Sequence, residues 1–134
     1  MAITVLIVDD SSVTRKVIKR HLSQGSFADA KVLEAGDGEE ALALIKEKKV
    51  DLVLSDWNMP KMTGLEFVQK VREYESKLSQ PDKKPVSIVM VTTEGTMEKI
   101  DKAFASGANE YITKPFNAET LNKTMKKVLY HTAE

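Results

Sequence analysis

The 134-residue chain contains no cysteine, only two histidines and no excess charge of either sign. The lack of cysteine excludes disulfide bonds, thiolate zinc sites, iron–sulfur clusters and cysteine nucleophiles. His21 and His131 lie near opposite ends of the sequence, which argues against a metal site built from histidines. Because 20 basic residues balance 20 acidic ones, we do not expect general binding to polyanions or to nucleic acid.

Long apolar runs are absent as well. No stretch approaches the roughly 20 residues that are needed to cross a bilayer. The apolar run Ile3–Val8 ends at two aspartates with no cleavage site of small residues, unlike a signal peptide. These features predict a cytoplasmic protein that does not associate with membranes.

The length is typical of a single domain with its own hydrophobic core. No internal repeat or low-complexity segment divides the chain, and only four residues follow Tyr130. We therefore predict one domain over residues 1–134, without an output domain.

Five short segments are apolar and rich in β-branched residues, and several of them are continuously apolar rather than alternating. This pattern is typical of strands that are covered on both faces, as in a parallel sheet. The predicted strands are Ile3–Val8, Lys31–Ala35, Asp51–Ser55, Val86–Val91 and Glu110–Thr113.

Amphipathic segments separate these strands and follow the last one. Their apolar stripes are Val13, Val17, Ile18 and Leu22; Ala41, Leu42 and Ile45; Leu65, Val68 and Val71; Met97, Ile100 and Phe104; and Leu121, Met125, Val128 and Leu129. Asp37 and Glu40, three residues later, predict a capping box. Thr96 and Asn117 are predicted N-caps, and Gly107 is predicted to end its helix in the left-handed conformation.

Strands that alternate with helices predict an α/β fold, namely a doubly wound (βα)5 parallel sheet. The flavodoxin-like strand order 2-1-3-4-5 is the leading arrangement. The polar segment Glu75–Pro85 interrupts the pattern and is predicted to be an extended loop.

Polar residues leave the carboxyl ends of four predicted strands, where open α/β sheets bind their ligands. They are Asp9 and Asp10, Asp56, Thr92 and Lys114. Each alone has an ordinary interpretation as a helix cap, a turn residue or a solvated lysine. Three carboxylates within ~5 Å, however, repel each other by roughly 3 kcal/mol per pair at an effective dielectric constant near 20.

A hard divalent cation removes this repulsion, and carboxylate and carbonyl oxygens are ligands that Mg²⁺ accepts. The neighbouring hydroxyl and ammonium groups are suited to a phosphoryl group. No glycine-rich phosphate-binding motif occurs in the chain. A Mg²⁺-dependent phosphohydrolase of the haloacid-dehalogenase type remains an alternative. Such an enzyme needs an Asp-x-Asp pair at the end of the first strand, whereas Asp9 and Asp10 are adjacent. A binding module that is never phosphorylated is the other alternative.

Four separated blocks resemble the response-regulator receiver family, in the same order and spacing along essentially the whole chain. They are Val8-Asp9-Asp10-Ser11; Ser55-Asp56-Trp57-Asn58-Met59-Pro60 with Thr63-Gly64; Val91-Thr92-Thr93-Glu94; and Tyr111-Ile112-Thr113-Lys114-Pro115-Phe116. The block that begins at Asp56 is especially similar to the chemotaxis members of this family. The resemblance therefore implies a two-component signalling protein, with chemotaxis as its process.

The resemblance also implies roles for individual residues. Asp56 would accept the phosphoryl group, and Lys114 would pair with one of its oxygens. Mg²⁺ would be held by Asp10, Asp56 and the backbone carbonyl of Asn58, with Asp9 acting through water. Thr92 and Tyr111 would form the switch, and the protein would assist its own phosphorylation and dephosphorylation without being a classical enzyme.

Further implications concern partners and neighbouring residues. The phosphodonor would be a sensor histidine kinase or a histidine phosphotransfer domain, and the chain would act as a monomer. A surface of the fourth helix, fifth strand and fifth helix would bind a downstream protein, with the flagellar motor switch as the candidate. Basic residues of the first helix are either a solvated face or a kinase-docking surface; they are Arg15, Lys16, Lys19 and Arg20.

The resemblance carries three smaller implications and shows one departure. Asn58 and Glu94 would tune the access of hydrolytic water, and Pro115 would follow a cis peptide bond. Trp57 would report ligand binding through its fluorescence. Thr93 departs from the family, which often has a small residue there.

Overall fold

The computed structural model describes residues 3–78, 85–93 and 95–130. Glu94 and His131, which were considered above, lie outside these described residues. Five strands and five helices alternate along this described part of the chain, as predicted: β1 (Thr4–Val8), α1 (Ser12–Ser23), β2 (Lys31–Ala35), α2 (Gly38–Glu47), β3 (Leu52–Asp56), α3 (Gly64–Ser76), β4 (Ser87–Thr92), α4 (Met97–Ser106), β5 (Glu110–Thr113) and α5 (Ala118–Leu129).

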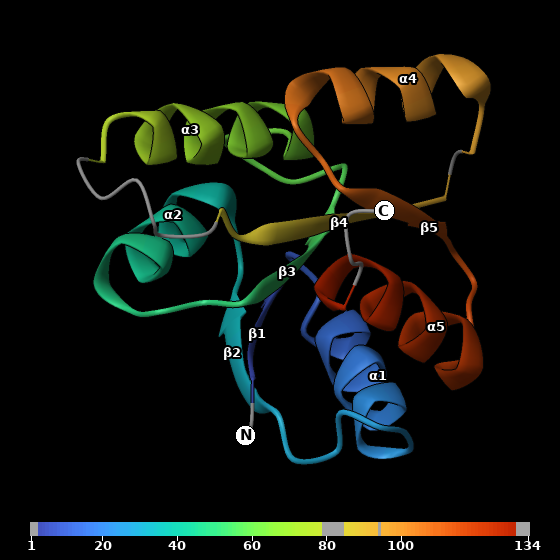
Figure 1. Ribbon diagram of the computed structural model, residues 1–134. Coiled ribbons are helices and arrows are strands. Elements are labelled where there is room, and N and C mark those ends of the chain that lie inside the picture. The colour runs from blue at the N-terminus through green and yellow to red at the C-terminus, as the bar shows by residue number, and fades with distance from the viewer. Residues whose placement is uncertain (1–2, 79–84, 94, 131–134) are drawn as a thin grey trace.

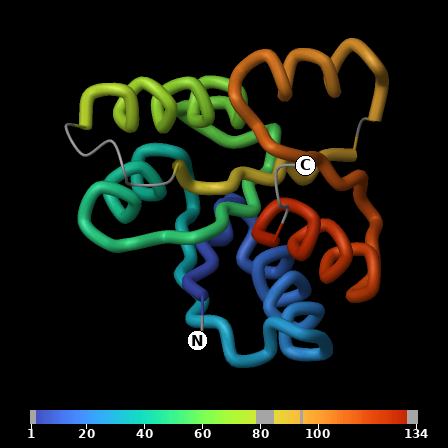
Figure 2. The backbone as a smooth tube through the Cα atoms, in the orientation of Figure 1, coloured from blue at the N-terminus to red at the C-terminus, as the bar shows by residue number. Residues whose placement is uncertain are grey.

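The strands form one parallel sheet in the order β2-β1-β3-β4-β5, which confirms the predicted doubly wound arrangement. The helices lie on both faces of this sheet, with α1 and α5 side by side on one face and α2, α3 and α4 on the other (Figure 1). The backbone passes through a helix between each strand and the next one in sequence (Figure 2). This topology brings the carboxyl ends of all five strands to the same edge.

Two hydrophobic cores flank the sheet, because neighbouring residues of a strand face opposite sides. In β1, Leu6 and Val8 pack toward α2 and α3, whereas Val5 and Ile7 pack toward α1 and α5. All four are fully buried. This double coverage explains why the central strands are continuously apolar in sequence.

The strand boundaries differ from the predicted ones by a single residue in three cases. The predicted strand Asp51–Ser55 is shifted to Leu52–Asp56, because the Asp51 carboxylate instead accepts a hydrogen bond from the Thr4 N–H at 2.8 Å. The fourth strand is shifted in the same direction and includes Thr92. As a result, Asp56 and Thr92 are the last residues of their strands rather than the first residues beyond them.

Side-chain caps begin the helices, as the sequence predicts for three of them. The side chains of Asp37, Thr96 and Asn117 each accept a hydrogen bond from the backbone N–H three residues later. The capping box predicted at Asp37 and Glu40 has only its Asp37 half, because, within the described part of the chain, no bond from the Glu40 side chain returns to the Asp37 N–H. A reciprocal capping box lies instead at Thr63 and Glu66, which were not predicted from the sequence. Gly107 ends α4 with φ 116°, the left-handed conformation that was predicted.

Two predicted apolar stripes are less buried than expected. Only Ile18 and Leu22 of the α1 stripe are buried, while Val13 is 69% exposed, because the sheet and α5 cover a single side of this helix. Met97 is also 69% exposed, because α4 lies near the edge of the sheet, where it contacts α3 and β5. The hydrophobic spacing therefore predicted both helices correctly, but it overestimated how many of their apolar side chains are buried.

The predicted loop Glu75–Pro85 was too long at its start. Helix α3 continues through Ser76, and the Glu75 carboxylate accepts a hydrogen bond from the Val86 N–H at 2.7 Å. Residues 79–84 of the predicted loop lie outside the described residues. None of the described helices has the length and apolar character that a membrane span requires.

Candidate functional site

The predicted polar residues come together at the carboxyl edge of the sheet. Carboxylate oxygens of Asp9, Asp10 and Asp56 all lie within 4.8 Å of one another. The Lys114 Nζ atom lies 3.4 Å from a carboxylate oxygen of Asp9 and 3.4 Å from one of Asp56. Strands β1, β3 and β5 thus deliver three acids and one ammonium group to a single cluster.

Asp9 is the most firmly held of the acids. Its side chain is only 4% exposed, and its Oδ1 atom accepts a hydrogen bond from the Ser11 N–H at 2.9 Å. Its own N–H donates to the Ala35 carbonyl at 3.1 Å, which extends the pairing of β1 with β2 by one residue. Asp10, by contrast, is exposed at the mouth of the cluster.

Asp56 ends β3 with a side chain that is 12% exposed. Its Oδ1 atom accepts a hydrogen bond from the Trp57 N–H at 2.9 Å. Burial raises the pKa of the Asp56 carboxyl above its usual range; the Lys114 ammonium opposes this shift, while the Asp9 charge adds to it. The ionised form of Asp56 is therefore left partly uncompensated by the protein alone.

The donor set fits a hard divalent cation. Three carboxylates face one ammonium group, so the cluster carries excess negative charge in its ionised form. The acids supply oxygen ligands from two strand ends, and the exposed side of Asp10 leaves access for water. This chemistry matches Mg²⁺, which binds through carboxylates while keeping several waters.

A backbone hydrogen bond joins Thr92 and Lys114. Thr92 is buried at the end of β4, and its carbonyl accepts a hydrogen bond from the Lys114 N–H at 2.7 Å. In the sheet register Asp56 pairs with Val91, so Thr92 lies one residue further along the neighbouring strand. The Lys114–Pro115 peptide bond is cis, as the resemblance implies.

The remaining predicted residues surround this cluster. Asn58 is exposed just beyond β3, and the Trp57 ring is buried in the core beneath the Lys99 ammonium, 5.1 Å from the ring centre. Tyr111 is half-buried and packs edge-on against Phe104 of α4, with ring centres 6.1 Å apart.

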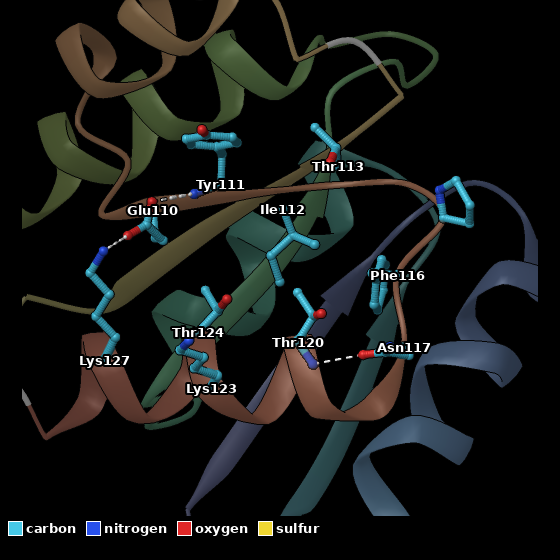
Figure 3. A pocket seen from close by; sticks show the side chains of 11 residues that line it. Glu110, Tyr111, Ile112, Thr113, Phe116, Asn117, Thr120, Lys123, Thr124 and Lys127 are labelled. Carbon is cyan, nitrogen blue, oxygen red and sulfur yellow. Dashed lines mark hydrogen bonds and ion pairs between the residues drawn. The ribbon is translucent and has the colours of Figure 1, made fainter.

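A hollow of about 670 Å³ lies between β5 and α5. In Figure 3, Ile112 points toward α5 on this side, whereas Tyr111 points to the opposite side of β5. Lys127 of α5 reaches across to Glu110 at 2.7 Å. The switch candidate Tyr111 is thus the neighbour, in the short strand β5, of Ile112, which faces α5 and the hollow.

The contacts of Arg15 are not apparent from the sequence. This residue was grouped with three other basic residues of α1, but its Nε atom pairs with Glu34 of β2 at 2.9 Å, and its Nη1 atom donates to the Asp9 carbonyl. Lys19 also pairs with Glu34, at 3.1 Å. Lys16 and Arg20 are exposed, as a solvated or docking face requires. Arg15 and Lys19 are four residues apart, so they lie on one face of the helix and can share an acidic partner. Only the β1–β2 register identifies this partner as Glu34.

Comparison with known proteins agrees with this geometry. Residues 5–126 match the response regulator receiver domain family. The chemotaxis protein CheY homolog of Campylobacter jejuni (strain 81-176) is 42% identical over 125 residues, covering 92% of this chain and 90% of the relative. Chemotaxis protein CheY1 of Helicobacter pylori (strain 26695) is 41% identical, covering 92% and 94%.

Solved structures are similar over almost the whole length. Chemotaxis protein CheY4 of Vibrio cholerae, crystallised at low pH, has a TM-score of 0.83 at 41% identity and covers 96% of this chain and 100% of its own. The receiver domain of the Saccharomyces cerevisiae response regulator Ssk1, in its co-crystal structure with the histidine phosphotransfer protein Ypd1, represents a more distant similarity. Its match has a TM-score of 0.86 at 28% identity and covers 96% of this chain and 90% of the other.

Proposed function

Because this chain belongs to the response regulator receiver domain family, we propose that it is a signalling protein controlled by phosphorylation of Asp56. Its similarity to CheY-type chemotaxis regulators makes chemotaxis the proposed process. The observation that supports the proposal most directly is the acid cluster: three carboxylates within 4.8 Å, with one ammonium 3.4 Å from two of them. A purely structural role does not explain this cluster, because like charges that lie so close together repel each other.

Asp56 is the proposed nucleophile. A carboxylate oxygen of its ionised form attacks the phosphorus of a phosphohistidine, a P–O bond forms, and the P–N bond breaks with its electron pair remaining on the imidazole nitrogen of the donor. The product is an acyl phosphate on Asp56. Water later attacks the phosphorus and releases inorganic phosphate, which restores the carboxylate.

The neighbouring groups stabilise charge during this transfer. Asp10, Asp56 and the Asn58 carbonyl would hold Mg²⁺ directly, and Asp9 would act through water. The bound ion would neutralise phosphoryl oxygens. Lys114 Nζ, already 3.4 Å from Asp56, would pair with a further phosphoryl oxygen. Because backbone N–H groups hold the carboxylates of Asp9 and Asp56, these two acids need little rearrangement to meet the incoming phosphoryl group.

Thr92 and Tyr111 are the proposed switch. A Thr92 hydroxyl that turns toward the phosphoryl group leaves space beside β4, and Tyr111 on the neighbouring strand β5 can rotate into it. This movement would alter the surface of α4, β5 and α5, where the hollow between β5 and α5 lies. A downstream protein that recognises this surface would thereby sense phosphorylation.

The proposed phosphodonor is a sensor histidine kinase or a histidine phosphotransfer protein. The Ssk1 receiver, which was crystallised with the histidine phosphotransfer protein Ypd1, is similar to this chain over nearly its whole length. The flagellar motor switch is the proposed output partner because of the similarity to chemotaxis proteins. Both partners would meet the chain as a monomer.

The test is phosphorylation of the purified chain with acetyl phosphate and Mg²⁺, followed by intact-mass spectrometry and Trp57 fluorescence. We expect one phosphoryl group, sensitive to hydroxylamine and absent from Asp56→Asn. Asp29→Asn, the same chemical change at an exposed position, is the matched control and should be phosphorylated normally. Stoichiometric phosphate on Asp56→Asn, or repeated turnover of external phosphate esters, would contradict the proposal.

A further inference from the structure

Arg15 connects the acid cluster to the neighbouring strand. It lies in the first turns of α1, and its side chain is only 19% exposed despite its charge. The guanidinium has two different partners, the Glu34 carboxylate at 2.9 Å and the backbone carbonyl of Asp9. One rigid fork therefore joins α1, β2 and the segment that carries two of the acids.

The contact with the Asp9 carbonyl has a geometric consequence for Asp10. The carbonyl of Asp9 and the N–H of Asp10 belong to one planar peptide unit. The Asp9 N–H is held by the Ala35 carbonyl at 3.1 Å, so the Arg15 contact fixes the other side of this residue. Holding the oxygen thus fixes the peptide plane that ends at the Asp10 Cα atom, and with it the backbone position from which the Asp10 side chain extends.

Asp10 depends on this backbone support more than the other acids do. Within the described residues no hydrogen bond or ion pair holds its carboxylate, whereas Asp9 and Asp56 each receive a backbone N–H and the Lys114 ammonium. Asp10 is also exposed. Its direction is therefore determined mainly by the backbone.

Glu34 keeps the Arg15 fork in place. It lies on β2 opposite Ile7 of β1, so the sheet register places it beside the strand that leads into the acids. Lys19 binds its other oxygen at 3.1 Å. The hydrogen bonds and charges of Lys19 and then Arg15 lower the pKa of the Glu34 carboxyl, so it remains an ionised anchor at neutral pH.

We propose that Arg15 is a positioning residue for the divalent-cation site, which it supports by fixing the peptide between Asp9 and Asp10. The inference rests on the proposed function, because it concerns the cation that this function requires. Arg15 itself does not touch the cation. It acts on the orientation of the Asp10 carboxylate through a backbone carbonyl.

Charge alone predicts the opposite effect of removing Arg15. A positive guanidinium near the acids repels a divalent cation, so a neutral residue at this position would strengthen Mg²⁺ binding if only the charge mattered. The positioning role predicts weaker binding instead. The sign of the change in Mg²⁺ affinity therefore separates the two explanations.

The experiment is a Mg²⁺ titration followed by Trp57 fluorescence on the wild-type chain, Arg15→Met, Arg15→Lys and Lys19→Met. We expect Arg15→Met to weaken Mg²⁺ binding by about tenfold, the size typical of residues that orient metal ligands. Lys19→Met is the matched control, because it removes the other cation on Glu34 without touching Asp9. Its Mg²⁺ affinity should stay the same or rise slightly.

Arg15→Lys keeps the charge but not the two-armed fork, so we expect an affinity between those of the wild type and Arg15→Met. If Arg15→Met does not fold, this variant decides the question. Unchanged or tighter Mg²⁺ binding in folded Arg15→Met, or in Arg15→Lys in that case, would overturn the inference alone. A wild-type chain that does not bind Mg²⁺ would overturn the proposed function together with it.

Discussion

Replacing Asp56 with asparagine should stabilise the chain in the absence of divalent cations. Asp56 has two acids within 4.8 Å, and each repulsion amounts to about 3 kcal/mol at an effective dielectric constant of about 20. Its attraction to Lys114 at 3.4 Å is about 5 kcal/mol on the same scale, so the charge is not fully compensated. The balance favours Asp56→Asn by on the order of 1 kcal/mol. Asparagine can still accept the Trp57 N–H.

Mg²⁺ should reverse this advantage. At a concentration ten times its dissociation constant, Mg²⁺ adds about 1.4 kcal/mol to the free energy of unfolding of the wild type. This corresponds to an increase of about 5 °C in the melting temperature for a chain of this length. Asp56→Asn lacks one ligand and should gain far less.

The pH dependence follows from the raised pKa of Asp56. Its charged form costs stability only where the carboxyl is ionised in the folded chain. In the absence of metal, the advantage of Asp56→Asn should therefore be present at neutral pH. It should shrink as the pH falls through the folded pKa and vanish below the unfolded value near 4.

The assay is urea unfolding followed by far-UV circular dichroism, with EDTA or with Mg²⁺, so that the signal does not depend on Trp57. Asp29→Asn is again the control for loss of one exposed charge. A metal-free Asp56→Asn chain that is less stable than the wild type would show that charge repulsion at Asp56 does not limit the stability of the fold. Equal stabilisation of both chains by Mg²⁺ would refute the assignment of Asp56 as a metal ligand.

Three further variants test the surrounding structure by urea unfolding. Lys61 has φ 70°, which asparagine tolerates better, so Lys61→Asn should raise the free energy of unfolding by about 0.5 kcal/mol; a decrease would contradict this. Arg72 donates hydrogen bonds to the Gly107 carbonyl at the end of α4, at 3.0 Å, and to the side chains of Glu75 and Asn109. Arg72→Met should therefore lower the free energy of unfolding by about 2 kcal/mol. A loss below about 0.5 kcal/mol would show that these three bonds contribute little. Glu34 has a lowered pKa because of Lys19 and Arg15, so Glu34→Gln should cost less than about 1 kcal/mol at neutral pH. That difference should disappear as the pH falls through the lowered pKa, and a difference that persists at pH 2 would contradict the ion-pair explanation.

Much of the fold was predictable because it depends on local patterns. Continuously apolar strands, helical spacing and the caps at Thr96 and Asn117 are short-range signals, and they located every strand and helix to within a few residues. The errors occurred where a distant partner decides. The Asp51 side chain caps β1 rather than continuing β3, and Val13 remains exposed because α1 is covered on one side only.

The residues of the site are readable from the primary structure: three acids, a hydroxyl and a lysine, each at the end of a strand. Parallel topology then requires these ends to share one edge, so their convergence follows from the strand pattern of the sequence. Two features depend on the folded arrangement: Lys114 is shared between Asp9 and Asp56, and Arg15 turns from the basic face of α1 toward Glu34 and the Asp9 carbonyl. These contacts join residues on different elements, and their distances depend on register and helix orientation, which local sequence patterns do not specify.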